Sequence, residues 1–294
     1  MNRSVKVYAG IETGGSKWKC AVGTGPEDVR AETAIPTTTP AETIGRVVDF
    51  ISNKGPVHAV GIGAFGPLDA DPASPTWGFV TTTPKPGWAH TDVGQEIRRR
   101  LGVPVAFDTD VNAAALGEHR WGAAQGLDTF LYVTIGTGIG GGGMAGGKLL
   151  HGLVHPELGH LRVPHDLAAD PFPGMCPYHG DCLEGLASGR ALEARWGRPA
   201  HELDEAEVWE LEARYLALGF VAAICVLSPQ RIVVGGGVTQ EPRLLPFVRD
   251  KVRRLLNGYV DNAAVTDGNS TYITAPALGS RSGVLGAIAL AETA

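Results

Sequence analysis

The sequence has little cysteine, no cluster of basic residues and no long apolar run, and each scarcity excludes a class of protein. Four cysteines among 294 residues are too few for the disulfide framework of a small secreted domain. Cys20 and Cys225 lie singly in apolar segments, so we expect both to be small core residues. The formal net charge is −6 with acids and bases intermixed, which disfavours a surface for nucleic acid or anionic membranes.

Targeting signals are scarce as well. The first residues, MNRSVKVYAGIETGG, contain no apolar signal segment. No apolar run approaches the roughly 20 residues that span a bilayer. We therefore expect a cytoplasmic protein that binds neither nucleic acid nor membrane.

Glycine is in excess, with 41 residues, about twice the usage of roughly 7% in average proteins. Many glycines follow apolar segments that are typical of strands. Residues 5–23 form an apolar segment, a Gly-rich turn and a second strand-like segment; residues 129–150 repeat this plan, and 231–238 end a third strand in glycines. Such turns allow a tight backbone and close approach to a ligand.

Helical patterns separate these strands. Thr39 is predicted as an N-cap, with Pro40 at the first helical position and Glu42 completing a capping box; Gly55 would stop this helix. Thr109 or Asp110 opens a second helix through 111–122. The remaining helices are expected within 203–230, stopping before Pro229, and over 280–292.

Alternating strands and helices predict an α/β fold, and the duplicated hairpins predict two similar lobes. We place a small lobe at 1–118 together with the C-terminal helix at about 280–294. A large lobe then covers 119–279. Each lobe would bring one glycine turn to a shared cleft.

The second glycine turn must be distinguished from a dinucleotide fingerprint. Gly136, Gly138 and Gly141 match G-x-G-x-x-G, but that fingerprint requires a helix to begin in the loop, and the glycines that follow disfavour one by about 1 kcal/mol each. A strand-turn-strand whose N–H groups converge on phosphate is the better interpretation. Tight hairpin turns without a ligand remain the alternative. Hydroxyl donors stand beside the turns at Thr13, Ser16, Thr134 and Thr137.

An acidic residue stands where a predicted strand meets a helix. The apolar segment VPVAF leads directly into DTDVNAAALGE, which places Asp110 at the junction. A carboxylate there can cap the helix or accept the proton of an alcohol in phosphoryl transfer. Asp108 competes with Asp110 for either role, and the spacing alone leaves both roles open.

Cys176, His179 and Cys182 have the spacing of zinc ligands, and tetrahedral zinc takes a fourth ligand. Histidines within reach along the chain are His151, His155, His160 and His165. A site closed by four protein ligands would be structural, because it leaves no position for a reacting water.

The motifs GIETGGSK, DTDVNAAALGE, TIGTGIGGG, HPELGH, CLEG and VVGGGV occur in the order found in the ROK family of sugar kinases and repressors, which this chain resembles over nearly its whole length. GFVTTTPKPGWAHTDV and CPYHGDC look like its bacterial fructokinase branch. The resemblance implies an α/β, two-lobed actin/hexokinase-like (ribonuclease H-like) fold, with ATP and Mg²⁺ in an interlobe cleft and a structural zinc.

The resemblance also assigns nucleotide contacts. Glu12 replaces the Asp and Ser16 the Thr of the family's first phosphate motif, so the relation of Glu12 to Mg²⁺ stays open. The residues expected to bind ATP are Gly14, Gly15, Ser16, Lys17, Thr137, Gly138, Gly235, Gly236, Gly237 and Val238.

On the sugar side, the resemblance makes Asp110 the catalytic base. Thr109 stands where the family usually has Asn, which argues against a plain glucose site. The expected sugar contacts are Gly66, Thr109, Glu157, His160 and Glu184. The resemblance also selects the fourth zinc ligand, so the predicted zinc ligands are His160, Cys176, His179 and Cys182.

We therefore predict an ATP-dependent hexokinase that phosphorylates the 6-hydroxyl of D-fructose, with a homodimer implied by the resemblance. The alternatives are a kinase for mannose, glucose, allose or N-acetylmannosamine, and a non-catalytic ROK regulator that senses sugar. A zinc hydrolase that uses the Cys/His cluster directly is a third class.

Overall fold

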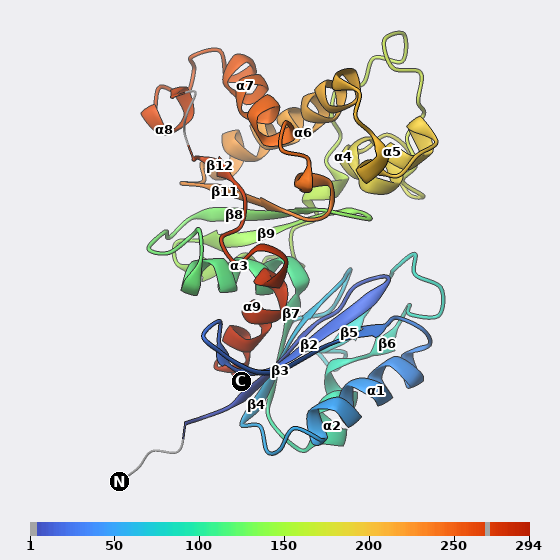
Figure 1. Cartoon of the computed structure of the whole chain (residues 1–294), viewed down its shortest axis with the longest axis vertical. Helices are drawn as coiled ribbons and strands as arrows, with labels where there is room; N and C mark the ends of the chain where they lie inside the picture. The colour runs from blue at the N-terminus through green and yellow to red at the C-terminus, as the bar shows by residue number, and fades with distance from the viewer. Residues whose placement is uncertain (1–4, 268–270) are drawn as a thin grey trace. The chain divides into compact units, whose positions relative to one another are not determined.

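The computed structural model describes residues 5–267 and 271–294, and contacts divide the chain into two compact units. The first unit contains Met1–Gln125, Leu149–His155 and Ala277–Ala294, and the second contains Gly126–Lys148 and Pro156–Pro276. Each unit is built on its own five-stranded sheet (Figure 1). The functional division at 118 and 280 stays a prediction. That Leu149–His155 packs with the first unit was not predicted.

The first sheet has the strand order β3-β2-β1-β4-β7. Strands β1, β2 and β3 are antiparallel neighbours, whereas β1, β4 and β7 run parallel. Because parallel strands end at the same edge, the segments that follow β1, β4 and β7 lie together. These strands are β1 Tyr8–Glu12, β2 Lys17–Gly25, β3 Asp28–Pro36, β4 Ala59–Ala64 and β7 Val105–Thr109.

One face of this sheet packs on α1 (Pro40–Ser52) and α2 (Gly94–Leu101), in a core that includes Ile11, Ile62 and Trp18. The predicted N-cap of α1 is confirmed, since the Thr39 hydroxyl accepts from the Glu42 N–H at 3.4 Å. The capping box is wrong in one respect. The Glu42 carboxylate accepts from the Thr38 hydroxyl at 2.7 Å and from the Arg46 guanidinium at 2.6 Å, so its two oxygens are used by side chains.

The opposite face packs on α9 (Ser282–Ala291), which also contacts α3 (Asp110–Trp121) (Figure 1). Glycines allow this close packing. A Cβ at Gly10 would lie 2.5 Å from the Val284 carbonyl oxygen, and one at Gly61 would lie 1.9 Å from that of Ala287. The helix backbone therefore lies directly on β1 and β4.

Glu118 fastens the C-terminal segment to α3. Its side chain is fully buried and accepts four hydrogen bonds at 2.7–3.0 Å. The donors are the backbone N–H groups of Ala123, Ala277 and Leu278 and the hydroxyl of Ser282. A buried carboxylate with four donors is well compensated for its lost hydration.

Replacing Glu118 with Ala is expected to lower the free energy of unfolding by about 3 kcal/mol, because the substitution leaves buried donors without an acceptor. Ser282→Ala removes one of the four bonds and should cost about 1 kcal/mol. Urea denaturation of both variants measures the difference. A Glu118→Ala protein within about 0.5 kcal/mol of the wild type, the range of a neutral surface change, would contradict this view.

The second sheet has the order β10-β9-β8-β11-β12, with β8 antiparallel to β9 and parallel to β11. The predicted strand-turn-strand is confirmed, and no helix begins in the glycine turn of β8 and β9. The strands are β8 Phe130–Ile135, β9 Ile139–Ala145, β10 Lys148–Leu149, β11 Ile232–Gly235 and β12 Ile273–Thr274.

The long helix α6 (Ala206–Leu227) ends before Pro229 as predicted, with Ser228 in the left-handed conformation at φ 50°. Cys20 is buried as expected, but Cys225 is exposed, so the expectation of a core residue is wrong. The reason is that the last turns of α6 direct apolar side chains outward, including Val226 at 88% exposure. The other helices of this unit are α4 Leu183–Ala187, α5 Gly189–Trp196, α7 Leu244–Leu256 and α8 Ala263–Thr266.

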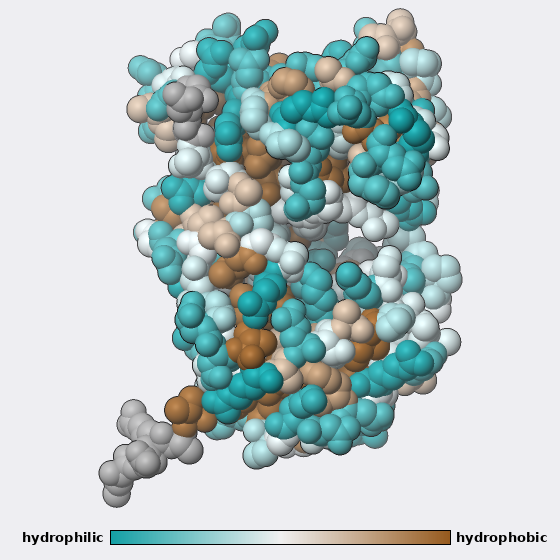
Figure 2. Space-filling view, viewed as in Figure 1, coloured by the Kyte–Doolittle hydropathy of each residue, from teal (hydrophilic) through white to brown (hydrophobic). Residues whose placement is uncertain are grey.

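Hydrophilic residues cover most of the face shown in Figure 2, over elements of both units. Across residues 5–267 and 271–294, none of the helices combines the length and apolar character needed to cross a membrane.

Candidate active site

The predicted first phosphate turn, Gly14 to Lys17, joins β1 to β2. Gly15, Ser16 and Lys17 are exposed. Thr37 holds the turn at two points: its hydroxyl donates to the Gly14 carbonyl at 2.7 Å and its N–H to the Ser16 carbonyl at 3.0 Å. The turn is therefore fixed in shape while its outer surface stays open.

Thr13 was expected to offer its hydroxyl as a donor beside the turn, and this expectation is wrong. Its side chain is 1% exposed, and its hydroxyl accepts from the Phe65 N–H at 2.9 Å. Its own N–H donates to the Gly63 carbonyl at 2.8 Å. Thr13 thus joins the end of β1 to the end of β4 and does not present its hydroxyl to a ligand.

Glu12 ends β1 with a largely enclosed carboxylate. Burial raises the pKa of this carboxyl, and the Lys19 ammonium opposes the shift. That ammonium lies 3.3 Å from Oε2 and also donates to the Ser280 carbonyl at 2.6 Å. A carboxylate oxygen of this kind is a ligand that Mg²⁺ accepts, directly or through water.

Asp110 is the first residue of α3, directly after β7. The structure resolves the question of the helix cap: the Thr109 hydroxyl accepts from the Asn112 N–H at 3.1 Å. The Asp110 carboxylate accepts from the Val111 N–H at 2.9 Å. A Cβ at Gly63 would lie 3.2 Å from the Asp110 Cα, so Asp110 lies beside the end of β4. Because Thr109 is the N-cap, the Asp110 carboxylate is not needed for that role.

Asp108 is not the helix cap, which is Thr109, and its side chain holds a network that sequence reasoning missed. It is 3% exposed and accepts from the Thr109 N–H at 2.7 Å and from Asn112 Nδ2 at 2.9 Å. His151 Nε2 lies 2.8 Å from its second oxygen, and this hydrogen bond raises the pKa of the imidazole. Asn112 also donates to the Leu150 carbonyl at 3.2 Å. Segment 150–151 is thereby fastened to the first turn of α3.

Gly66 lies in the segment that follows β4, at the edge of the sheet where β1, β4 and β7 end. A Cβ there would lie 3.1 Å from His155 Cε1. His155 Nε2 accepts from the Leu68 N–H at 3.1 Å. The histidine closest in sequence to the predicted sugar contact Glu157 therefore braces the Gly66 loop and takes no part in the Cys/His cluster.

In the second unit, Glu184 holds the predicted second phosphate turn. Its carboxylate accepts from the Ile139 N–H at 2.9 Å, and a Cβ at Gly138 would lie 2.4 Å from the same oxygen. Gly136 is fixed by the Gly189 N–H, which donates to its carbonyl at 2.7 Å. Thr137 remains exposed at the tip. The family resemblance predicted Glu184 only as a sugar contact, and nothing in the sequence indicated its hydrogen bond with the Ile139 N–H.

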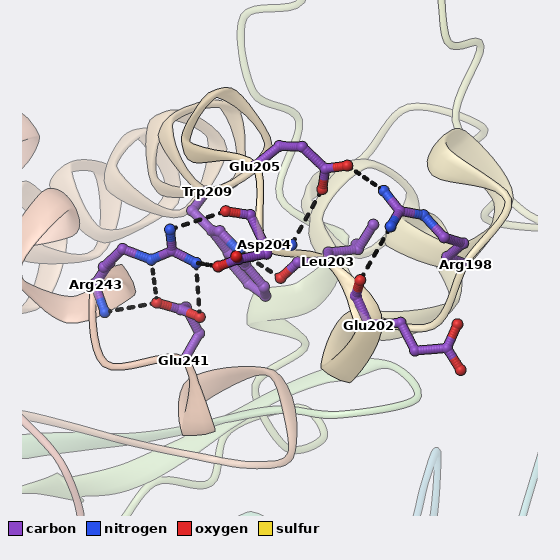
Figure 3. Close-up of polar contacts among 8 residues, drawn as sticks. All are labelled: Arg198, Glu202, Leu203, Asp204, Glu205, Trp209, Glu241 and Arg243. Atoms are coloured by element: carbon purple, nitrogen blue, oxygen red, sulfur yellow. Dashed lines mark hydrogen bonds and ion pairs between the residues drawn. The ribbon is translucent and has the colours of Figure 1, made fainter.

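The predicted adenosine turn, Gly235 to Val238, follows β11. Only glycine fits position 236, where φ is 102° and a Cβ would lie 2.2 Å from the Ile135 carbonyl oxygen. The next residues are fixed by Arg243, whose guanidinium contacts Glu241 and donates to the Asp204 carbonyl at 3.0 Å (Figure 3). The chain after the turn is thus tied to the loop that precedes α6.

His160, Cys176, His179 and Cys182 converge, with one ligand atom from each lying within 4.8 Å of the others. His160 Nδ1 lies 3.6 Å from each of the two sulfurs and 3.2 Å from His179 Nδ1. Two sulfur and two nitrogen donors at such separations fit one tetrahedral zinc. Burial raises the pKa of the Cys182 thiol to about 11; because metals bind the thiolate, metal binding here should release protons.

The same imidazole joins the cluster to a predicted sugar contact. While its Nδ1 faces the sulfurs, its Nε2 lies 4.0 Å from Glu157 Oε2. Burial and the nearby Glu184 carboxylate together raise the pKa of Glu157 to about 7. Glu157 and Glu184 therefore form an acidic pair beside the Cys/His cluster, and such a pair can accept hydrogen bonds from several sugar hydroxyls.

Comparison with known proteins defines the class. The model of the ROK family matches residues 8–294, and the chain belongs to this family. A fructokinase of Zymomonas mobilis is 44% identical over 305 residues, covering 100% of this chain and 99% of its own.

Solved structures agree with this assignment. A ROK hexokinase from Thermus thermophilus superposes with a TM-score of 0.77 at 28% identity, covering 98% of each chain. A ROK glucokinase from Streptomyces griseus, solved with glucose and AMPPNP, gives 0.73 at 28% identity, covering 98% of this chain and 100% of its own. The fold is that of a two-lobed sugar kinase.

Proposed function

We propose that this protein is an ATP-dependent fructokinase that converts D-fructose to fructose 6-phosphate. The observation that carries the proposal is similarity to a fructokinase at 44% identity over the whole chain, against 28% for a glucokinase. The position of Asp110 supports it, because Thr109 performs the capping role that would otherwise explain an acid at that place.

The reaction follows from these assignments. The Asp110 carboxylate accepts the proton of the sugar 6-hydroxyl while that oxygen bonds to the γ-phosphorus. The bond from the γ-phosphorus to the bridging oxygen breaks, and its electron pair leaves with ADP. A positioned base of this kind contributes about 10²–10⁴ in rate.

Nucleotide binding is assigned to glycine turns in both units. In the first unit, Gly14, Gly15, Ser16 and Lys17 would hold terminal phosphate oxygens through N–H groups and the Lys17 charge. In the second unit, Thr137 and Gly138 would hold phosphates, and the turn at Gly235, Gly236, Gly237 and Val238 would receive adenosine. Mg²⁺ supplies charge neutralisation at the phosphates, and Glu12 offers a carboxylate for its hydration shell.

Sugar recognition is assigned to Gly66, Thr109, Glu157, His160 and Glu184. Zinc held by the Cys/His cluster would supply rigidity, and four protein ligands would leave no open position for hydrolytic chemistry. His160 would then hold Glu157 in place through its second nitrogen. The predicted homodimer and cytoplasmic location stay predictions.

A coupled assay of ADP formation across fructose, mannose, glucose, allose and N-acetylmannosamine tests the proposal. We expect kcat/KM for fructose to exceed that for glucose by at least about 100-fold, because sites that read hydroxyl groups discriminate strongly between sugars. Reactions without sugar and without Mg²⁺ serve as controls. A higher kcat/KM for another hexose would reassign the substrate, and no turnover with any sugar would favour a non-catalytic ROK regulator.

A further inference from the structure

A loop that carries a lysine reaches the first phosphate turn from the sugar side. Residues 81–90 connect β5 (Phe79–Val80) to β6 (Thr91–Asp92), an antiparallel pair. Lys85 lies at the middle of this connection and donates from Nζ to the Gly15 carbonyl at 2.5 Å. Its segment, TTTPKPGW, carries part of the resemblance to fructokinases, but none of its residues is given a contact in the function proposed above.

The turn that presents Lys85 is firmly anchored. Pro86 and Gly87, with φ 79° at Gly87, occupy the two central positions that a type II turn prefers, and the Trp88 N–H donates to the Lys85 carbonyl at 3.2 Å. The Trp88 side chain is 0% exposed, and its Nε1 donates to the Thr38 carbonyl at 3.0 Å.

Trp88 also links this turn to the phosphate turn itself. Its ring centroid lies 5.3 Å from that of Trp18, which directly follows Lys17. Thr37, next to the Trp88 acceptor Thr38, holds both Gly14 and Ser16. The Lys85 ammonium and the phosphate turn are therefore positioned by one shared set of contacts.

The start of the loop lies beside the predicted sugar contact. The Thr81 N–H donates to the Pro67 carbonyl at 2.7 Å, one residue after Gly66. The loop thus extends from the sugar side to the phosphate turn, within the first unit. Asp110 approaches the same end of β4, at Gly63.

We propose that Lys85 is a second cationic group of the phosphate site and contacts the phosphoryl group during its transfer to the sugar. This inference rests on the proposed kinase function. An ammonium has three donors and one is used by Gly15, so two remain for phosphoryl oxygens. Charge spreads over these oxygens in the transition state, where a fixed cation is most effective.

Lys85→Met and Lys85→Arg test the proposal, with Lys54→Met as the matched control. Lys54 is exposed, lies over the Phe50 ring at 5.5 Å and is not one of the assigned site residues. We expect Lys85→Met to lower kcat about 100-fold, as loss of one charge-stabilising donor does, with KM for fructose within about 3-fold. Lys85→Arg should recover most of this loss, and Lys54→Met should match the wild type.

Calorimetric titration with MgATP and MgADP, without sugar, separates contact with the phosphoryl group from a role in shaping the turn. If Lys85 contacts the phosphoryl group, Lys85→Met should weaken the binding of MgATP about 10-fold and the binding of MgADP less than about 2-fold. Equal weakening of both nucleotides, or a kcat within about 3-fold of the wild type, would overturn the inference. If the wild type failed to phosphorylate fructose, the proposed substrate would fall, while the ATP-to-ADP comparison would still decide the role of Lys85.

Discussion

Asp110→Asn is expected to bind fructose and MgATP with near-normal affinity and to lose at least about 100-fold in kcat. The amide has nearly the size of the carboxylate and can still interact with a hydroxyl, but it does not accept the proton of the 6-hydroxyl at neutral pH. The loss should therefore fall on the chemical step and leave KM for fructose within about 3-fold. Steady-state kinetics and calorimetric titration of both ligands measure the two effects separately.

Thr109→Ala is the matched control for Asp110→Asn. It removes the hydroxyl that caps α3 and should cost about 1 kcal/mol of stability, yet it keeps the Asp110 carboxylate. Because Thr109 is also assigned to sugar recognition, the two variants are compared by kcat at saturating fructose and not by KM. If the loss in Asp110→Asn arose from a disturbed helix start, Thr109→Ala would lose kcat to the same extent. A kcat near normal in Asp110→Asn would remove Asp110 as the base.

Local patterns in the sequence were sufficient to predict the turns of the site. Two hairpins with Gly-rich turns, the N-cap at Thr39 and the end of α6 before Pro229 follow from rules that act over a few residues. The rejection of a dinucleotide fingerprint at Gly136 rested on the cost of glycine in a helix, and β9 (Ile139–Ala145) is indeed a strand.

The contacts that position the site were beyond such reasoning, because they join residues far apart in the chain. Asp108 and His151 are 43 residues apart in sequence yet lie 2.8 Å apart, and Glu184 meets the Ile139 N–H from 45 residues away. Lys85 reaches Gly15 across 70 residues. The sequence marked Asp108, His151 and Glu184 as candidates for other roles, but nothing in it indicated which distant groups they contact.

Cys225 shows a different limit. The end of α6 is apolar around its whole circumference, so the sequence gives no polar stripe to indicate which side faces water. The structure exposes Cys225 together with Val226, whereas the preceding residue, Ile224, is buried. Burial here is decided by packing on other elements and not by composition.

Cys182→Ser should lose bound zinc, unfold at lower temperature and bind fructose more weakly. Cys182 directly precedes α4, whose second residue is Glu184, and its sulfur lies 3.6 Å from His160 Nδ1. Without the thiolate, the link between His160 and the segment before Glu184 would be released. We expect the free energy of unfolding to fall by about 3 kcal/mol or more, a Tm change of roughly 10 °C, and KM for fructose to rise about 10-fold.

Cys225→Ser provides the matched control, because it makes the same chemical change at an exposed position on α6. It should retain the zinc content, Tm and KM of the wild type. Zinc analysis by atomic absorption, thermal denaturation and fructose kinetics on both variants distinguish a structural metal from a catalytic one. A structural metal, or brace, predicts that Cys182→Ser loses zinc, Tm and fructose affinity together. It also predicts that kcat at saturating fructose falls by a smaller factor than the factor by which KM rises. Raised KM in a stable, zinc-replete Cys182→Ser protein would contradict the brace, and so would full stability in a protein that has lost its zinc.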